Sequence, residues 1–287
     1  MSWSIREKVV LVTGGNSGIG RATAEELARR GARVMITARD PSKGELAADA
    51  IHRASGAAVE VGDLDLSRLD SVREFAATFS ASHGRLDVLI NNAGVITGRR
   101  QKTVDGNEWT FGVNHLGPFL LTSLLTDLLV ASSPSRIINV SSRVHQSRKN
   151  GLDFEDLHMK RGYSSSKAYA ASKLANILFT LELDRRLRDS GVSARALHPG
   201  VVATSFGQGA EGPGWIRHLM PLIKPVIRTP QNGAATSVHL ACADPSTLLD
   251  GLYWTDCKPK EPIQAAVDPA AASRLWAMSE ELVGLVP

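Results

Sequence analysis

Hydrophobic and polar positions along the chain form short apolar runs that take turns with longer segments of helical spacing. The short runs are rich in β-branched residues and do not alternate, which predicts strands buried on both faces of a sheet. We expect strands at residues 9–12, 32–37, 57–61, 86–90, 136–140, 193–197 and 251–254. The longer segments predict helices from about 18 to 31, from 41, and over 67–82, 109–129, 166–191 and 231–243, with a last helix at the C-terminus.

This strict alternation predicts an α/β fold. The expected architecture is a doubly wound Rossmann fold, with a parallel sheet of about seven strands and helices on both faces. We find no internal repeat, linker or low-complexity block, so residues 1–287 are expected to form one domain. Residues 205–230 are rich in Gly and Pro and carry scattered apolar side chains, which favours a substrate lid over the alternative of ordinary packing or a loop that covers the sheet edge. The same mixture of apolar and basic residues also suits contact with a membrane surface.

A glycine-rich turn follows the first predicted strand. Gly14 permits a tight turn, while Gly18 and Gly20 let the backbone and the next helix approach a pyrophosphate closely. The helix that starts near Gly18 presents free amide groups to a phosphate. A strand, a glycine-rich turn, a helix and a second strand form the context that a dinucleotide site requires. The predicted contacts here are Gly14, Asn16, Ser17, Gly18, Ile19 and Gly20.

Arg39 and Asp40 follow the second predicted strand, where such proteins distinguish between cofactors. A carboxylate at this place accepts hydrogen bonds from the ribose of NAD, whereas an arginine pairs with the 2′-phosphate of NADP. Asp40 comes one step late for the first role, and we expect it to cap the helix that starts near Pro41. We therefore predict that NADP(H) is preferred and that NAD(H) is the alternative. In that alternative, Arg39 is an ordinary solvated charge.

Small and polar residues follow three further strands, at the sheet edge where ligands bind in this kind of fold. Asp65 could accept a hydrogen bond from the adenine amino group or cap a helix, and Ser67 is expected to cap the helix over 67–82. The fifth strand ends at Ser141 and Ser142. The residues expected to border the cofactor from these strand ends are Asp65, Leu66, Asn91, Asn92, Ala93 and Gly94.

Tyr169 and Lys173 stand four residues apart in a segment of strong helix formers, so they share one helix face. A phenol with its ordinary pKa of ~10 is a poor base at neutral pH, and a nearby ammonium group favours the phenolate. Tyr163 and Lys167 have the same spacing, but the serines between them suit a loop or a helix start better than a helix interior. We therefore predict that Tyr169 and Lys173 form the catalytic pair.

Composition excludes several classes of protein. The formal net charge of the 287 residues is +4, and the basic residues are mixed with acidic ones, so no nucleic-acid-binding face is indicated. Cys242 and Cys257 are too few for a disulfide framework, and neither they nor the eight dispersed histidines have metal-ligand spacing. No signal core and no apolar run of about 18 residues is present. We expect a cytoplasmic protein without a metal or a transmembrane segment.

The motifs between Thr13 and Thr204 resemble those of the short-chain dehydrogenases/reductases. The runs Asn114-His115-Leu116-Gly117, Lys173-Leu174-Ala175-Asn176 and Asp256-Cys257-Lys258 look most like the retinol dehydrogenase branch, including its WW-domain oxidoreductase relatives. Many members of that branch carry an N-terminal membrane anchor, whereas this sequence starts directly at its first strand. The resemblance therefore implies a soluble relative, and a homo-oligomer is the family's expectation.

The resemblance also implies a role for each matching residue. Tyr169 would exchange a proton with the substrate oxygen, and Lys173 would bind the nicotinamide ribose and lower the tyrosine pKa. Ser142, rather than Ser141, would hydrogen-bond the substrate oxygen, and Asn114 would hold a water that links Lys173 to a proton relay. Residues 91–94 would support the adenosine side. The residues that would orient the nicotinamide carboxamide are Pro199, Gly200, Val202 and Thr204.

These residues together predict an NADP(H)-dependent oxidoreductase that transfers hydride between the nicotinamide and an alcohol or its carbonyl partner. The expected substrate is lipophilic, such as a retinol-like or steroid-like alcohol, ketone or aldehyde. One alternative is a catalytically silent NADP(H)-binding regulatory protein, since a fold does not prove activity. The complete set of Ser142, Tyr169 and Lys173 argues against that alternative, because binding alone requires no acid or base. An epimerase or dehydratase of the same fold is a further alternative.

Overall fold

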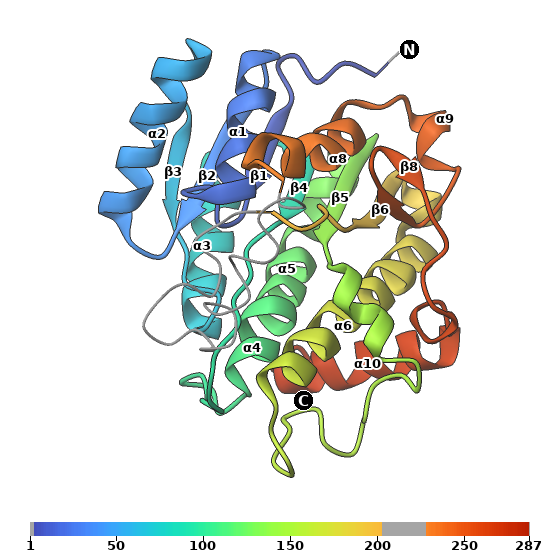
Figure 1. Ribbon diagram of the computed structural model, residues 1–287. Coiled ribbons are helices and arrows are strands. Elements are labelled where there is room, and N and C mark those ends of the chain that lie inside the picture. Colours follow the sequence, from blue (N-terminus) through green and yellow to red (C-terminus); the bar gives the residue numbers. More distant parts are fainter. Residues whose placement is uncertain (1–2, 203–227, 287) are drawn as a thin grey trace.

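The computed structural model describes residues 3–202 and 228–286, and these residues build an α/β fold around one sheet (Figure 1). Within the described residues the sheet has eight strands in the order β3-β2-β1-β4-β5-β6-β7-β8. Every neighbouring pair is parallel except β7 and β8, which are antiparallel. The strands are β1 (Val9–Val12), β2 (Arg33–Ala38), β3 (Glu60–Asp63), β4 (Val88–Asn91), β5 (Ser135–Val140), β6 (Val192–Leu197), β7 (Tyr253–Thr255) and β8 (Lys258–Pro259).

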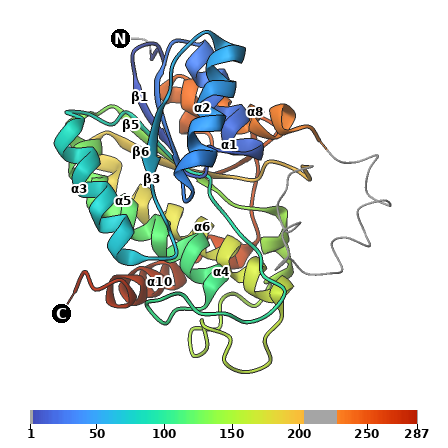
Figure 2. The ribbon, with the colours of Figure 1, turned by 90° about the vertical axis from the view of Figure 1, so that its left-hand side faces the viewer.

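Helices cover both faces of the sheet, and Figure 2 shows the two helical layers on either side of it. One layer, with its own apolar core, contains α1 (Gly18–Arg29), α2 (Pro41–Ser55) and α8 (Pro230–Cys242). The other layer contains α3 (Leu69–Ser82), α4 (Trp109–Phe111), α5 (Gly117–Ala131), α6 (Ser165–Leu187) and α10 (Pro269–Leu282). The remaining short elements are α9 (Pro245–Leu248) and the 3₁₀ helices η2 (Arg143–Ser147), η3 (Arg188–Ser190) and η5 (Gln264–Ala266).

The order of the strands places the ligand site. The chain runs outward from β1 through β2 to β3, and then returns to place β4 on the other side of β1. At such a reversal the loops after the two central strands turn to opposite faces and leave a crevice at the carboxyl ends. The glycine-rich turn after β1 and residues 92–94 after β4 therefore meet at this point.

The predicted doubly wound fold is confirmed, and the strands differ from prediction in detail. β3 begins at Glu60 rather than at residue 57, and an eighth strand was not predicted. This strand pairs with β7 through a tight turn in which Asp256 and Cys257 have positive φ angles of 53° and 58°. A turn of this conformation usually contains Gly or Asn, so the sequence lacked the usual signal.

The helix predicted over 109–129 is continuous in space but not uniform. A π-helical segment, Gly112–Leu116, joins α4 to α5, and Asn114 lies within it. The stretch Trp109–Ala131 is long and apolar enough to cross a membrane, yet 67% of its most apolar window is buried inside the fold. Packing beneath the sheet therefore accounts for its apolar character.

Helix starts test two of the capping predictions. Asp40 caps α2 as predicted, because its Oδ1 accepts hydrogen bonds from the amides of Ser42 and Lys43 at 3.1 and 3.4 Å. The prediction that Ser67 caps the next helix is wrong. Helix α3 begins at Leu69, whose amide donates to the carboxylate of Asp105 at 3.2 Å, while the Ser67 hydroxyl donates to Asp65. A residue 36 positions away thus supplies the cap.

Most of the predicted lid, residues 205–230, lies outside the described residues, and so does Thr204. The two positions that flank the gap are held together: Val202 and Arg228 form a parallel bridge, and the Arg228 amide donates to the carbonyl of Val201 at 2.8 Å. Arg228 also forms an ion pair with Asp256 in the turn between β7 and β8. This base of the segment sits beside the carboxyl end of β6.

Candidate active site

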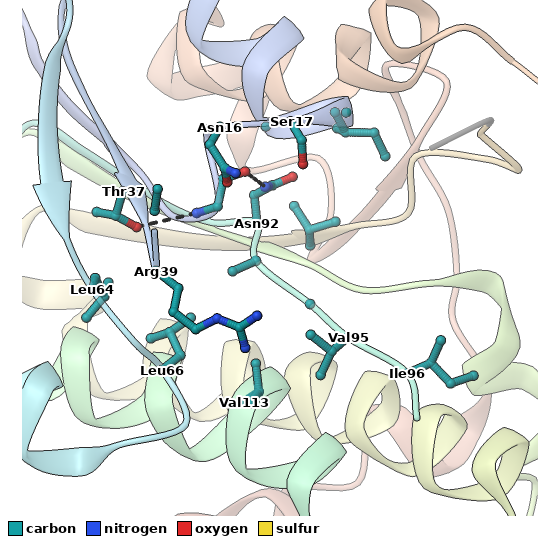
Figure 3. A pocket seen from close by; sticks show the side chains of 18 of the residues that line it. Asn16, Ser17, Thr37, Arg39, Leu64, Leu66, Asn92, Val95, Ile96 and Val113 are labelled. Atoms are coloured by element: carbon teal, nitrogen blue, oxygen red, sulfur yellow. Dashed lines mark hydrogen bonds between the residues drawn. The ribbon is translucent and has the colours of Figure 1, made fainter. Parts of the chain in front are cut away.

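A cavity of about 700 Å³ opens at the carboxyl ends of the central strands, and Figure 3 shows most of the side chains that line it. It brings together residues that follow β1, β3 and β4, residues at the carboxyl ends of β2 and β5, residues of the loop after β6, and residues of helix α6. The predicted site residues that line it are Gly14, Asn16, Ser17, Gly18, Ile19, Gly20, Arg39, Asp65, Leu66, Asn92, Ala93, Gly94, Tyr169, Lys173, Gly200 and Val202.

The glycine-rich turn forms a tight cradle against the loop after β4. A Cβ atom on Gly14, which has a φ of +64°, would lie 3.1 Å from Ala93, and a Cβ atom on Gly20 would lie 2.4 Å from the side chain of Asn92. Asn92 closes the cradle because its Nδ2 donates to the carbonyl of Thr13 at 2.8 Å. Larger residues at these glycines would separate the two loops.

The first turn of helix α1 faces the cavity with its amide groups. Gly18, Ile19 and Gly20 begin the helix and line the cavity, and Ser17 at the N-cap makes no side-chain capping hydrogen bond. The first amides of a helix have no partner within the helix and carry its positive dipole end. This arrangement suits the pyrophosphate of a dinucleotide.

Arg39 reaches into the cavity from the carboxyl end of β2, and Figure 3 shows its guanidinium group between Leu66 and Val95. Lys43, on the first turn of α2, lines the same cavity and forms an exposed ion pair of 3.5 Å with Asp40. Two cations therefore stand at this end. Sequence reasoning missed Lys43, although its place one helical turn beyond Asp40 was a usable signal.

Asp65 lines the cavity, and its carboxylate is engaged locally. Its Oδ1 accepts hydrogen bonds from the amide and the hydroxyl of Ser67 at 2.9 and 2.7 Å. These bonds form a turn before α3 rather than a helix cap. A carboxylate has further lone pairs, so the turn also fixes Asp65 beside a ligand.

The last residues of strand β5 hold helix α6 at the inner end of the cavity. Lys173 donates from its Nζ to the carbonyl of Val140 at 2.9 Å, and the hydroxyl of Ser141 donates to the backbone carbonyl of Lys173 at 2.6 Å. Next in the chain, Ser142 forms a side-chain hydrogen bond with Tyr169. Three consecutive residues of β5 and its end therefore fix the Tyr169–Lys173 face.

Burial governs the protonation of this pair. It raises the pKa of Tyr169 to about 12, although the hydrogen bond with Ser142 lowers it, and it lowers the pKa of Lys173 to about 8. We expected Lys173 to bring the tyrosine pKa down. Instead its Nζ is directed at Val140 and lies 5.6 Å from the centre of the Tyr169 ring, so desolvation of the phenolate dominates.

The alternative pair, Tyr163 and Lys167, is built differently. Tyr163 precedes helix α6, which begins at Ser165, so the two side chains do not share a helical turn. The Tyr163 hydroxyl lies 3.1 Å from the hydroxyl of Thr97. Neither residue lines the cavity that contains Tyr169.

Four predicted site residues lie behind or beside the cavity rather than on its lining. The Oδ1 of Asn114 accepts from the amide of Val95 at 2.7 Å, and its Nδ2 donates to the carbonyl of Val95 at 3.0 Å. The Nδ2 of Asn91 donates to Thr122 and Asn139, in a buried polar network under the site. The other two are Ser142 and the buried Pro199.

Several lining residues were not predicted from the sequence. Thr37 accepts a hydrogen bond from the amide of Gly14 at 3.4 Å, which links the ends of β1 and β2. The others are mainly apolar, and apolar side chains that line a cavity look like core residues in a sequence. Besides Asp40 and Lys43, they are Ala38, Leu64, Val95, Ile96, Trp109, Val113 and Val140, together with Thr97 and Ser141.

Comparison with known proteins identifies the family. Residues 8–154 match the family model described as short chain dehydrogenase. The chain is 46% identical to retinol dehydrogenase 14 of Mus musculus over 97% of its length and 86% of the relative, and 46% identical to human retinol dehydrogenase 13 over 98% and 86%.

Solved structures agree with this match. An uncharacterised protein from Mycobacterium paratuberculosis has a TM-score of 0.75 and 35% identity, with 99% and 98% of the two chains covered. A metagenomic short-chain oxidoreductase solved with NADP has a TM-score of 0.62 and 29% identity, with 83% and 92% covered. The chain therefore belongs to the short-chain dehydrogenase/reductase family, in its retinol dehydrogenase branch, and is an oxidoreductase of alcohol and carbonyl groups.

Proposed function

We propose that this protein is an NADP(H)-dependent oxidoreductase that interconverts a lipophilic alcohol and its aldehyde or ketone. One observation carries the proposal. The Tyr169–Lys173 face of α6, with Ser142 bonded to the phenol, opens on the same cavity as the uncapped start of α1 and the Arg39 side chain. A polar site for one carbon–oxygen group and a site for a dinucleotide are thus joined.

The residues present fit a nicotinamide dinucleotide. Cβ atoms on the glycines of the cradle would fill it, and the first residues of α1 line the cavity, where their free amides would suit a pyrophosphate. Arg39 and Lys43 give the adenosine end a positive charge, which favours a 2′-phosphate. The NADP-bound metagenomic oxidoreductase and a short-chain dehydrogenase from Sphingobium yanoikuyae solved with NADPH support the same preference.

Each residue of the inner end has a proposed role. When bound, the cofactor supplies or accepts the hydride at the substrate carbon, and its oxidised form adds a positive charge. In the reduction Tyr169 donates its proton to the substrate oxygen, and in the oxidation it takes that proton back. Ser142 hydrogen-bonds the same oxygen, and Lys173 binds the nicotinamide ribose.

The raised pKa of Tyr169 suits the reductive direction. A phenol whose pKa is about 12 stays protonated across neutral pH and can donate to an oxygen that gains negative charge. Asn114 is proposed to hold the water of a proton relay. Its side chain fixes the loop of Val95, and it also donates to the hydroxyl of Ser172, next to Lys173.

Two observations support a lipophilic substrate. The curated relatives named above are retinol dehydrogenases. Apolar side chains of Val95, Ile96 and Trp109 line the cavity beyond Gly94, and burial of apolar surface is the main source of affinity for such ligands.

The experiment is to follow oxidation of NADPH by the purified protein with all-trans-retinal, a steroid ketone and a set of aliphatic aldehydes. We expect turnover with at least one lipophilic carbonyl and a higher kcat/KM with NADPH than with NADH. Tight NADPH binding without turnover of any carbonyl or alcohol would overturn the proposal.

A further inference from the structure

His145 lies on η2, three residues beyond Ser142, and its ring is fully buried. Two nitrogens of His145 contact the carbonyl oxygen of Ser142. The backbone amide lies 3.1 Å from this oxygen, and the ring Nδ1 lies 2.7 Å from it. Because a carbonyl oxygen only accepts, Nδ1 must carry the proton in this contact. The imidazole is therefore a fixed donor to the backbone of Ser142.

The same turn aims the hydroxyl of Ser142. The amide of Val144 donates to the Oγ of Ser142 at 3.4 Å, so the hydroxyl proton of Ser142 remains for another acceptor. That hydroxyl bonds the phenol of Tyr169. Any rotation of the Ser142 backbone would move the hydroxyl away from Tyr169.

Tyr253 holds the imidazole in place from strand β7. The two rings make an edge-on contact with centroids 5.1 Å apart, and Tyr253 is 1% exposed. His198, whose Nδ1 accepts from the amide of Gly200 at 3.0 Å, also packs against Tyr253, with ring centroids 5.9 Å apart. The ring of His145 is thus enclosed and has one orientation.

Stability alone does not explain a histidine here. Among the described residues, the Nε2 of His145 has no hydrogen-bond partner, and a buried polar atom without a partner is unfavourable. Burial lowers the pKa of His145, as does the nearby charge of Lys260, although the bond to Ser142 opposes this, so the ring stays neutral. An apolar ring would fill the same space without the unpaired nitrogen.

We propose that His145 is a positioning residue for the reaction, whose Nδ1–H anchors the carbonyl of Ser142 and so keeps the Ser142 hydroxyl on Tyr169. This inference rests on the proposed function, because it assumes that Ser142 and Tyr169 act on the substrate oxygen. His145 itself does not line the cavity.

The test compares variants of His145 that keep either the aromatic ring or the hydrogen-bond donor, but not both. His145→Phe keeps a ring of similar size against Tyr253 and loses the donor. His145→Asn loses the ring but places its amide nitrogen near the position of Nδ1, whereas His145→Gln moves the amide one carbon farther. We expect kcat to fall about tenfold or more in the Phe and Gln variants, the size of one lost hydrogen bond, and to be largely retained in the Asn variant.

A second readout does not depend on turnover. The chain has three tyrosines, so ¹³Cζ-tyrosine labelling gives a small set of signals that Tyr163→Phe and Tyr253→Phe assign. In His145→Phe we expect the Tyr169 signal to change and its titration to move to higher pH, because the hydroxyl of Ser142 no longer favours the phenolate. In His145→Asn both should stay near those of the parent protein.

The outcomes are distinct. A normal kcat in the Phe variant beside a reduced kcat in the Asn variant would show that the ring of His145 matters only for packing, and it would overturn the inference. If the Phe variant does not fold, the Asn and Gln variants are compared instead, and equal kcat in these two would also overturn the inference. Full activity of Tyr169→Phe would instead overturn the proposed function, whereas an inactive Tyr169→Phe beside a fully active His145→Phe would reject the role of His145 alone.

Discussion

The hydroxyl of Ser141 donates a 2.6 Å hydrogen bond to the backbone carbonyl of Lys173. Its neighbour Ser142 instead bonds the phenol of Tyr169. Two adjacent serines therefore bond the same helix at different groups. Ser141 bonds a backbone carbonyl of the helix, and Ser142 bonds the side chain that is proposed to react.

Single alanine substitutions should separate these serines. Ser142→Ala removes a donor to the substrate oxygen, so we expect kcat to fall by about 10²-fold or more with little change in stability. Ser141→Ala should lower the free energy of unfolding by about 1 kcal/mol, because it removes a buried hydrogen bond, and should reduce kcat less. Steady-state kinetics and urea unfolding of both variants measure this. A larger loss of kcat in Ser141→Ala would reverse the assignment.

Tyr169→Phe should abolish most of the turnover, because removal of a general acid commonly costs about 10²–10⁴-fold. Tyr163→Phe is the matched control, since its hydroxyl bonds Thr97 and Thr110 rather than a residue of the proposed catalytic set. We expect its kcat to stay near that of the parent protein, with a loss of about 1 kcal/mol in stability. An inactive Tyr163 variant beside an active Tyr169 variant would contradict the site.

The pH dependence should differ between the two directions. Because burial raises the pKa of Tyr169, the phenol is protonated at neutral pH, and the rate of carbonyl reduction should stay level until alkaline pH and then fall. The rate of alcohol oxidation should rise with pH, because there Tyr169 must accept a proton. Ser142→Ala should shift both profiles upward in pH. Rates measured in both directions across the stable pH range test this, and parallel profiles would refute it.

Arg39→Ala should change the KM for NADPH and leave the KM for NADH nearly unchanged. If the guanidinium group pairs with a 2′-phosphate, the KM for NADPH should rise about 10- to 100-fold, the value of a charge-assisted hydrogen bond, while the KM for NADH changes little. Arg33→Ala is a suitable control, because Arg33 is exposed at the opposite end of β2. An equal effect of Arg39→Ala on both cofactors would remove the basis for the NADP preference.

Asp87 ties together the amino ends of the central strands and gives a prediction on stability. Its buried carboxylate accepts from the amide of Val9 at 2.9 Å, from Lys8 at 2.9 Å and from Arg85 at 2.8 Å. Although burial opposes ionisation, these donors hold the pKa of Asp87 below its ordinary value. We expect Asp87→Asn to lower the free energy of unfolding by about 2–3 kcal/mol at neutral pH.

The sign of the pH effect follows from the lowered pKa. Asp87 stabilises the fold above the pKa that it has in the unfolded chain, and this contribution is lost as pH falls through its lower folded pKa. The stability difference between the parent protein and Asp87→Asn should therefore shrink in acid. Urea unfolding at neutral and acidic pH measures it, and a difference that grows in acid would exclude this account.

Local chemistry explains how much of the site could be predicted from the sequence. The glycine turn, Arg39 and the Tyr169–Lys173 face each depend on residues within one turn or one strand end. The spacing of these residues in the sequence was therefore sufficient to select them as candidates. The cap of α3 by Asp105 and the packing of His145 against Tyr253 depend on how distant parts of the chain come together. Such contacts leave no periodic signal.

The protonation of Tyr169 was not predictable for the same reason. Spacing places Lys173 one turn away, but it does not reveal that the Lys173 ammonium group is directed at the carbonyl of Val140. The π-helical segment around Asn114 was equally hidden, because the residues 109–129 have an ordinary helical pattern.

The paired anchors Val202 and Arg228 have a consequence for the evolution of this protein. Because they are joined to each other and to Asp256, the two chain positions that flank residues 203–227 stay at a set spacing whatever connects them. The entropy of closing a loop depends only weakly on its length. A connecting segment of another length or composition can therefore be grafted between these anchors at small cost to folding.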